Sequence, residues 1–135
     1  MNKLRILLAD DHPYFLELVE GLLGTTFDVV GKVGDGRALF DAARELHPDI
    51  ILTDISMPVL NGIDAINELR RSGSSSKVIF LTVHTDADFI RTCLGAGAFG
   101  YIFKERVAID LVPAIREALA GHLFISPSDA AERRA

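Results

Sequence analysis

The chain has little cysteine, no long apolar run and no excess of positive charge, and each shortage excludes a class of protein. Cys93 is the single cysteine among 135 residues, which rules out an internal disulfide framework and suits the reducing cytoplasm. No apolar run approaches the roughly 20 residues of a membrane-spanning helix, and residues 1–9 lack the longer apolar stretch of a signal peptide. The net charge of −5 disfavours binding of nucleic acid by this chain itself. We therefore expect a cytoplasmic protein with no membrane partner.

Short apolar runs alternate with amphipathic stretches along the chain, and its length fits one domain. The first, third and fourth runs are nearly continuous in Ile, Leu and Val, as in strands covered by helices on both faces. Strict alternation of strands and helices predicts a parallel sheet with right-handed crossovers. We therefore expect an α/β, flavodoxin-like (βα)5 fold, a doubly wound five-stranded sheet of order 2-1-3-4-5. The predicted strands are Leu4–Ala9, Phe27–Val33, Asp49–Thr53, Lys77–Thr82 and Phe99–Phe103.

Five helices are expected between and after these strands. Their ranges are 15–23, 37–46, 62–72, 86–96 and 111–119. Pro13 suits a first helical turn, and Pro113 would do so too if Asp110 capped the last helix. Residues 1–122 would then form the domain, and residues 123–135 lose apolar periodicity and look like the start of a linker.

Polar residues follow four of the predicted strands at their carboxyl ends. Asp10 and Asp11 follow the first strand, Asp54 the third and Lys104 the fifth, while Thr82 ends the fourth. Sites in open α/β sheets form beyond these strand ends, so the side chains should meet in one crevice.

Three neighbouring carboxylates repel one another unless a cation lies among them. An incomplete set of oxygen ligands favours Mg²⁺, which keeps several waters and often shares a phosphate ligand. A cation, a lysine and a hydroxyl around a central carboxylate can stabilise a phosphoryl group attached to it. The arrangement therefore predicts phosphorylation of Asp54.

Four motifs in order carry a resemblance to a known family: residues 10–13 (DDHP), 54–62 (DISMPVLNG), Thr82, and residues 100–104 (GYIFK). Over roughly residues 4–121 the chain resembles the receiver domain of two-component response regulators. The DDHP start, His84 and residues 111–116 (LVPAIR) are most similar to the NarL/LuxR-type subclass, whose members usually carry a C-terminal helix-turn-helix.

The resemblance implies a role for each site residue. Asp54 would accept the phosphoryl group from a sensor histidine kinase or phosphotransfer protein, and Lys104 would pair with the phosphoryl oxygens. Asp11, Asp54 and the backbone carbonyl of Ser56 would ligate Mg²⁺, and Asp10 would act mainly through a water.

The resemblance also implies how the signal would leave the site. Thr82 would move toward the phosphoryl group and let Tyr101 rotate inward, changing the surface of residues 86–96, 99–103 and 111–119. Ser56 and His84 would tune the loss of the phosphoryl group, and Val83 would limit access by small phosphodonors. Such a domain catalyses only its own phosphorylation and dephosphorylation, can dimerise in response, and controls transcription through a DNA-binding output domain outside these 135 residues.

Several features have plainer or competing interpretations. A phosphatase of the haloacid-dehalogenase type also uses an aspartyl phosphate with Mg²⁺, but it needs an acid/base Asp two residues after the nucleophile, where this chain has Ser56.

The four histidines lack metal-ligand spacing, and none is predicted as a ligand. Residues 95–100 match the G-x-G-x-x-G dinucleotide pattern but close a predicted helix instead of opening one. Glu105 follows Lys104 where many receivers have a cis proline, so a trans bond is predicted.

Overall fold

Strands and helices alternate along the chain almost as the sequence predicts. The structure is a computed structural model that describes residues 3–127. The elements are β1 (Arg5–Ala9), α1 (Pro13–Leu23), β2 (Asp28–Val33), α2 (Gly36–Leu46), β3 (Ile50–Thr53), α3 (Gly62–Arg71), β4 (Lys77–Thr82), α4 (Ala87–Gly95), β5 (Gly100–Phe103), the 3₁₀ turn η1 (Lys104–Arg106), α5 (Val107–Leu119) and β6 (Phe124–Ile125). None of the helices in this part of the chain is long and apolar enough to cross a membrane.

The strands form one parallel sheet of order β2-β1-β3-β4-β5-β6. The predicted flavodoxin-like order 2-1-3-4-5 is therefore confirmed. The sheet has a sixth strand that the sequence did not predict, because two residues are too few to show a strand period. Residues 123–127, predicted as the start of a linker, thus include a strand of the sheet, and residues 128–135 lie outside the described part.

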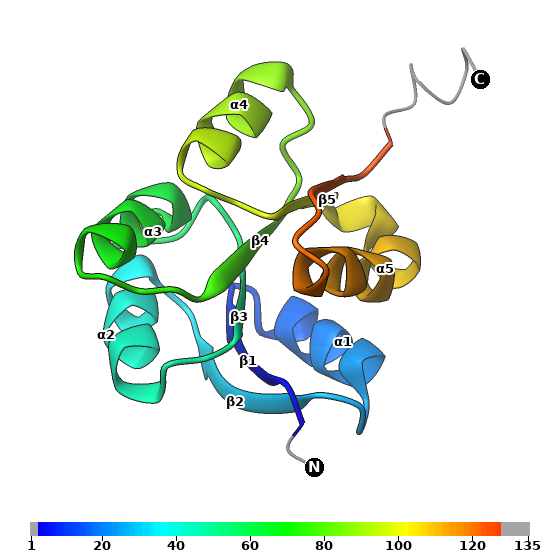
Figure 1. Ribbon diagram of the computed structural model, residues 1–135, viewed down its shortest axis with the longest axis horizontal. Helices are drawn as coiled ribbons and strands as arrows, with labels where there is room; N and C mark the ends of the chain where they lie inside the picture. Colours follow the sequence, from blue (N-terminus) through cyan, green and yellow to red (C-terminus); the bar gives the residue numbers. More distant parts are fainter. Residues whose placement is uncertain (1–2, 128–135) are drawn as a thin grey trace.

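Helices cover both faces of the sheet, α2, α3 and α4 on one side and α1 and α5 on the other (Figure 1). Alternate residues of β1 and β3 point into two separate cores. Leu7 and Ile51 pack beneath α2, α3 and α4, whereas Ile6 and Ile50 pack beneath α1 and α5. The sheet is thus buried on both faces, which explains the continuous apolar runs of its central strands.

The start of α5 differs from the prediction. The helix begins at Val107, so Pro113 lies inside it and Asp110 is not its cap. Pro113 cannot donate a backbone hydrogen bond to the carbonyl of Ile109, but Ile109 is strongly exposed and water can reach that turn. Asp110 is instead a buried carboxylate paired with Arg106.

Other local predictions are confirmed. Pro13 is the first residue of α1. Gly95 ends α4, and Gly97 has a φ of +89° in the turn before β5, so these glycines terminate a helix as predicted. The described chain contains no cis peptide bond, which confirms the trans bond between Lys104 and Glu105.

Candidate phosphorylation site

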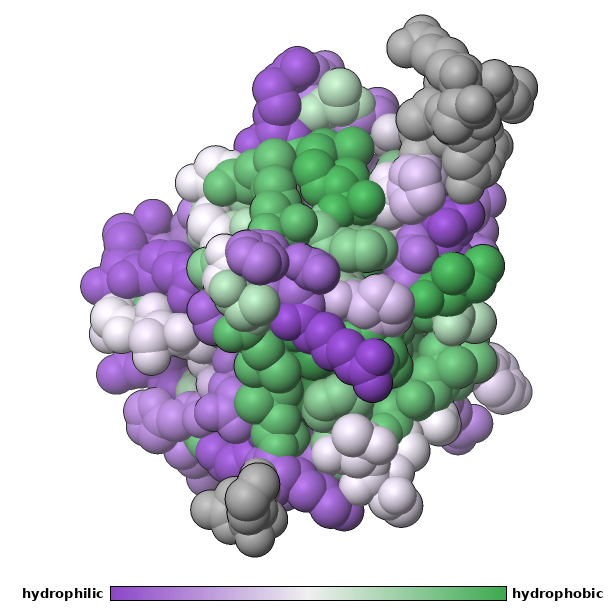
Figure 2. All heavy atoms as spheres, turned by 45° about the vertical axis from the view of Figure 1, so that its right-hand side comes forward, coloured by the Kyte–Doolittle hydropathy of each residue, from purple (hydrophilic) through white to green (hydrophobic). Residues whose placement is uncertain are grey.

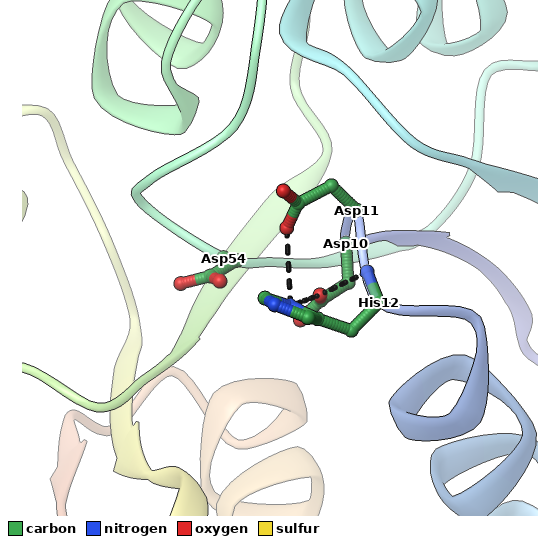
Figure 3. A group of neighbouring side chains, drawn as sticks. All are labelled: Asp10, Asp11, His12 and Asp54. Carbon is green, nitrogen blue, oxygen red and sulfur yellow. Dashed lines mark hydrogen bonds and ion pairs between the residues drawn. The ribbon is translucent and has the colours of Figure 1, made fainter.

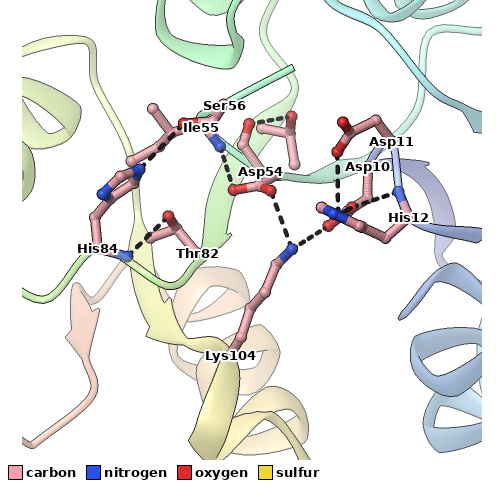
Figure 4. A network of polar contacts seen from close by, with 10 residues as sticks. Asp10, Asp11, His12, Asp54, Ile55, Ser56, Thr82, His84 and Lys104 are labelled. Carbon is pink, nitrogen blue, oxygen red and sulfur yellow. Dashed lines mark hydrogen bonds and ion pairs between the residues drawn. The ribbon is translucent and has the colours of Figure 1, made fainter. Parts of the chain in front are cut away.

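The polar strand ends meet at the carboxyl edge of the sheet, with Lys104 between two buried carboxylates. Asp10 is 2% exposed and Asp54 is 5% exposed. The Nζ atom of Lys104 lies 2.7 Å from Oδ2 of Asp10 and 3.0 Å from Oδ2 of Asp54 (Figure 4). The Phe15 ring lies against the same ammonium group, with its centroid 4.4 Å away. The ammonium group thus offsets the charge of two carboxylates that would otherwise repel each other.

Pairing with these carboxylates changes the affinity of Lys104 for its proton. Burial of the ammonium group lowers its pKa, but hydrogen bonds and charge attraction from Asp10 and Asp54 outweigh that effect and raise it. Lys104 therefore carries its positive charge throughout the physiological range, as pairing with phosphoryl oxygens would require.

Hydrogen bonds fix the backbone around Asp54. The Ile55 amide donates to Oδ1 of Asp54 at 2.7 Å, and the Gly62 amide donates to the Ile55 carbonyl at 2.7 Å. Gly62 is the first residue of α3, whose cap Asn61 accepts a hydrogen bond from the Asp64 amide. The start of α3 thus holds the loop that follows Asp54.

Asp10, Asp11, His12 and Asp54 each offer a ligand atom within 4.8 Å of the others (Figure 3). Oδ2 of Asp10 is buried, and its close polar partner among the described residues is the ammonium group of Lys104. The carboxylates supply the hard oxygen ligands that Mg²⁺ prefers, and Asp11 is open to water, which Mg²⁺ retains. The residues present therefore fit a magnesium ion.

His12 is a member of this cluster that the sequence analysis missed. Its Nδ1 atom lies 2.9 Å from Asp10 and 3.1 Å from Asp11, and its backbone amide donates to Oδ1 of Asp10. These contacts could not be predicted from spacing, because the four histidines lack metal-ligand spacing and His12 instead contacts two carboxylates. Phe15 lies in the predicted helix 15–23, and the contact of its ring with Lys104 likewise could not be predicted from helical periodicity.

On the other side of Asp54, three residues join β4 to the loop after β3. The His84 amide donates to Oγ1 of Thr82 at 3.2 Å, and the His84 ring lies 3.1 Å from Oγ of Ser56 through Nε2. The same ring stacks on Phe89 with centroids 4.1 Å apart. Figure 4 shows Thr82, Ser56 and His84 gathered beside Asp54, opposite the acidic cluster. Val83 points outward and is largely exposed.

Tyr101 is fully buried, with its hydroxyl donating to the backbone carbonyl of His84 at 2.7 Å. Burial is the main cause that raises the pKa of its phenol, so the hydroxyl stays a donor. The ring therefore lies inward, the position that the sequence analysis expects Tyr101 to take on phosphorylation.

With this geometry in place, comparison with known proteins identifies the family. Residues 6–116 match the response regulator receiver domain. The chain belongs to this family.

Curated relatives place it in the predicted subclass. The chain is 35% identical to the transcriptional regulatory protein DegU of Brevibacillus brevis over 93% of its own length and 54% of DegU. It is 35% identical to the nitrate/nitrite response regulator NarL of Escherichia coli K12 over 90% of its length and 57% of NarL. The chain thus spans little more than half the length of these relatives. The resemblance to NarL/LuxR-type regulators is confirmed, and the match decides against the phosphatase alternative.

Solved structures agree with this assignment. A LuxR-family two-component response regulator from Aurantimonas sp. SI85-9A1 superposes with a TM-score of 0.89 at 33% identity, covering 98% of this chain and 99% of that one. The isolated receiver domain of RcsB from Salmonella enterica serovar Typhimurium, solved with the phosphomimetic BeF₃⁻, gives a TM-score of 0.84 at 27% identity and covers 98% of both chains.

Proposed function

We propose that this receiver domain accepts a phosphoryl group on Asp54 from a sensor histidine kinase or phosphotransfer protein in the cytoplasm. The observation that carries the proposal is Lys104, which bridges the buried carboxylates of Asp54 and Asp10. A lysine held at this point can stabilise negative charge that arrives on Asp54.

The chemistry follows from the arrangement of the site. A carboxylate oxygen of Asp54 forms a bond to phosphorus while the bond from phosphorus to the donor imidazole breaks, and the imidazole nitrogen keeps the electron pair. Lys104 and the Thr82 hydroxyl then stabilise the phosphoryl oxygens. Asp11, Asp54 and the Ser56 carbonyl would hold Mg²⁺, with Asp10 acting mainly through a water. The ion would supply positive charge that offsets the negative charge of the phosphoryl group. The domain catalyses no reaction beyond its own phosphorylation and dephosphorylation.

The lifetime of the phosphoryl group would depend on Ser56 and His84. Their side chains contact each other beside Asp54 and so cover one approach for water. Val83, exposed next to them, would narrow the approach for small phosphodonors.

The output would be a shift of the surface formed by α4, β5 and α5. Phosphorylation would draw Thr82 onto the phosphoryl group and favour the inward position of Tyr101, in which its hydroxyl donates to the His84 carbonyl. In the whole protein, this shift would control DNA binding and transcription by an output domain that follows the receiver.

Dimerisation is a second part of the proposed output, and exposed apolar residues favour the face of α1 and α5. Tyr14 is 86% exposed and Ile109 is 65% exposed, and Leu18 lies one turn along α1 from Tyr14. Figure 2 turns this side of the molecule forward and shows hydrophobic residues at the surface among hydrophilic ones. A second copy could cover such residues on phosphorylation.

A phosphotransfer assay tests the proposal. With Mg²⁺, a phosphorylated sensor histidine kinase should label the wild-type chain stoichiometrically, and Asp54→Asn or a chelator should abolish labelling. Sedimentation of the chain with Mg²⁺ and beryllofluoride should show a dimer that Tyr14→Ser weakens. Labelling that persists in Asp54→Asn would refute the site, whereas a monomer in every condition would remove only the dimer.

A further inference from the structure

The last strand, β6, is attached to the sheet beside the residues that carry the signal. The Phe124 amide donates to the Phe99 carbonyl at 3.1 Å, and the Ser126 amide donates to the Tyr101 carbonyl at 2.9 Å. Ile125, between them, is exposed. Two backbone hydrogen bonds to an edge strand are a weak attachment, because such groups also bond well to water.

The Ser126 side chain supplies a stronger attachment. Its hydroxyl donates to Oδ2 of Asp110 at 2.7 Å and accepts a hydrogen bond from the Phe103 amide at 3.2 Å. Ser126 is 3% exposed and Asp110 is 4% exposed, so these bonds form away from water. A buried carboxylate without its donors is costly, and Asp110 therefore favours the docked position of Ser126.

Asp110 is also joined to the turn that holds the phosphorylation site. Its Oδ2 atom, which accepts from Ser126, accepts a second hydrogen bond from Nε of Arg106 at 2.8 Å. Arg106 is the last residue of η1 and Lys104 is the first. One three-residue turn thus contacts Asp54 and Asp10 through Lys104, and the C-terminal segment through Arg106 and Asp110.

We propose that residues 124–126 form a C-terminal latch that senses the state of Asp54 through this turn. The inference rests on the proposed phosphorylation of Asp54. When Lys104 exchanges its two carboxylate partners for phosphoryl oxygens, η1 shifts, and the contacts of Arg106, Asp110 and Ser126 change with it. The state of the site is thereby conveyed to the chain that follows residue 126, independently of any change at the surface of α4.

The test is hydrogen exchange at the Phe124 and Ser126 amides of the whole chain, with and without Mg²⁺ and beryllofluoride. Ser126→Ala and, separately, Asp110→Asn should speed exchange at both amides by at least about tenfold. Ser75→Ala, an exposed serine in the loop before β4, is the matched control and should leave both rates unchanged. Ser126→Ala keeps the backbone and the core, so it remains informative if Asp110→Asn fails to fold.

If docking of residues 124–126 is coupled to the phosphorylation site, each must affect the other. Saturating beryllofluoride should change exchange at the Ser126 amide of the wild type by about threefold or more, and Ser126→Ala should change the affinity for beryllofluoride by a matching factor. Beryllofluoride binding with unchanged exchange at these amides would overturn the latch while leaving the phosphorylation site intact. Failure of beryllofluoride to bind at all would overturn both. Unchanged exchange in Ser126→Ala would show that the hydroxyl does not hold the segment.

Discussion

Replacement of Gly62 by alanine should disrupt the proposed phosphorylation site through the backbone alone. A Cβ atom at Gly62 would lie 2.0 Å from the carbonyl oxygen of Asp54, whereas real contacts of this kind are essentially never shorter than 3.0 Å. The obstacle is main chain, which cannot rotate aside as a side chain can. Either α3 or the strand end that bears Asp54 must therefore move by about 1 Å.

The expected loss of stability is large for a single methyl group. Overpacking of a well-packed interior costs typically 1–3 kcal/mol, and a clash between two backbone segments belongs at the upper end, so we expect roughly 3 kcal/mol or a fall of about 10 °C in melting temperature. The hydrogen bond from the Gly62 amide to the Ile55 carbonyl should lengthen as well. Because the clash lies at the strand end that bears Asp54, the proposed labelling of Asp54 should slow by at least about tenfold.

A matched substitution separates the clash from the chemistry of the added methyl group. Gly21 lies inside α1, and a Cβ atom there would meet nothing within 4 Å. Gly21→Ala should therefore stabilise the domain by about 0.5–1 kcal/mol through helix propensity and leave labelling unchanged. Urea denaturation and phosphotransfer on both variants provide the measurement. A Gly62→Ala protein as stable and as readily labelled as the wild type would refute the close approach of α3 to Asp54.

Two further predictions follow from the charges and buried groups. Lys104→Met leaves the carboxylates of Asp10 and Asp54 facing each other without their cation, so in the absence of Mg²⁺ the free energy of unfolding should fall by about 3 kcal/mol. Added Mg²⁺ should then raise the melting temperature of this variant more than that of the wild type. Equal shifts in melting temperature for the two proteins would contradict a site shared by Lys104 and the ion. Stability should also fall as the pH rises above 9. Burial raises the pKa of the Cys93 thiol from 9.0 to about 12, so this group keeps its proton in the folded state after the unfolded chain has released it. The pKa values of Tyr101 and Lys104 are likewise raised above their ordinary values of 10.0 and 10.5, and these groups add to the fall at higher pH. Denaturation of Cys93→Ala between pH 8 and 11 checks the order, since this variant should show no fall between pH 9 and 10 but keep the fall above pH 10.

Much of the fold could be predicted from the sequence because its central strands are buried on both faces. That burial demands continuous apolar runs, and such runs stand out against the helical periodicity between them. The start of α5 was predicted wrongly, since Pro113 suggested a first turn. The helix begins at Val107, one turn earlier. Asp110 therefore lies inside the helix, and its carboxylate bonds to Arg106 and Ser126 instead of capping the first turn.

The convergence of the polar strand ends was also predictable. Five polar residues lie at or close to the carboxyl end of a strand: Asp10, Asp11, Asp54, Thr82 and Lys104. The order of the parallel strands brings those ends together. The contacts between side chains were not predictable in this way. The approach of His12 to two carboxylates, and of the Phe15 ring to Lys104, depends on how α1 packs against the sheet.

The sequence by itself thus determined the order of the elements, the family and the acidic site, because apolar periodicity and the polar residues at strand ends are local properties of the chain. Only the tertiary structure decided that Tyr101 lies inward, that Lys104 bridges Asp10 and Asp54, and that Ser126 docks on Asp110. These contacts join residues from 16 to 94 positions apart (110 to 126 and 10 to 104). No spacing rule links such pairs, and the free energy of each depends on burial that exists only once the sheet and its helices have packed.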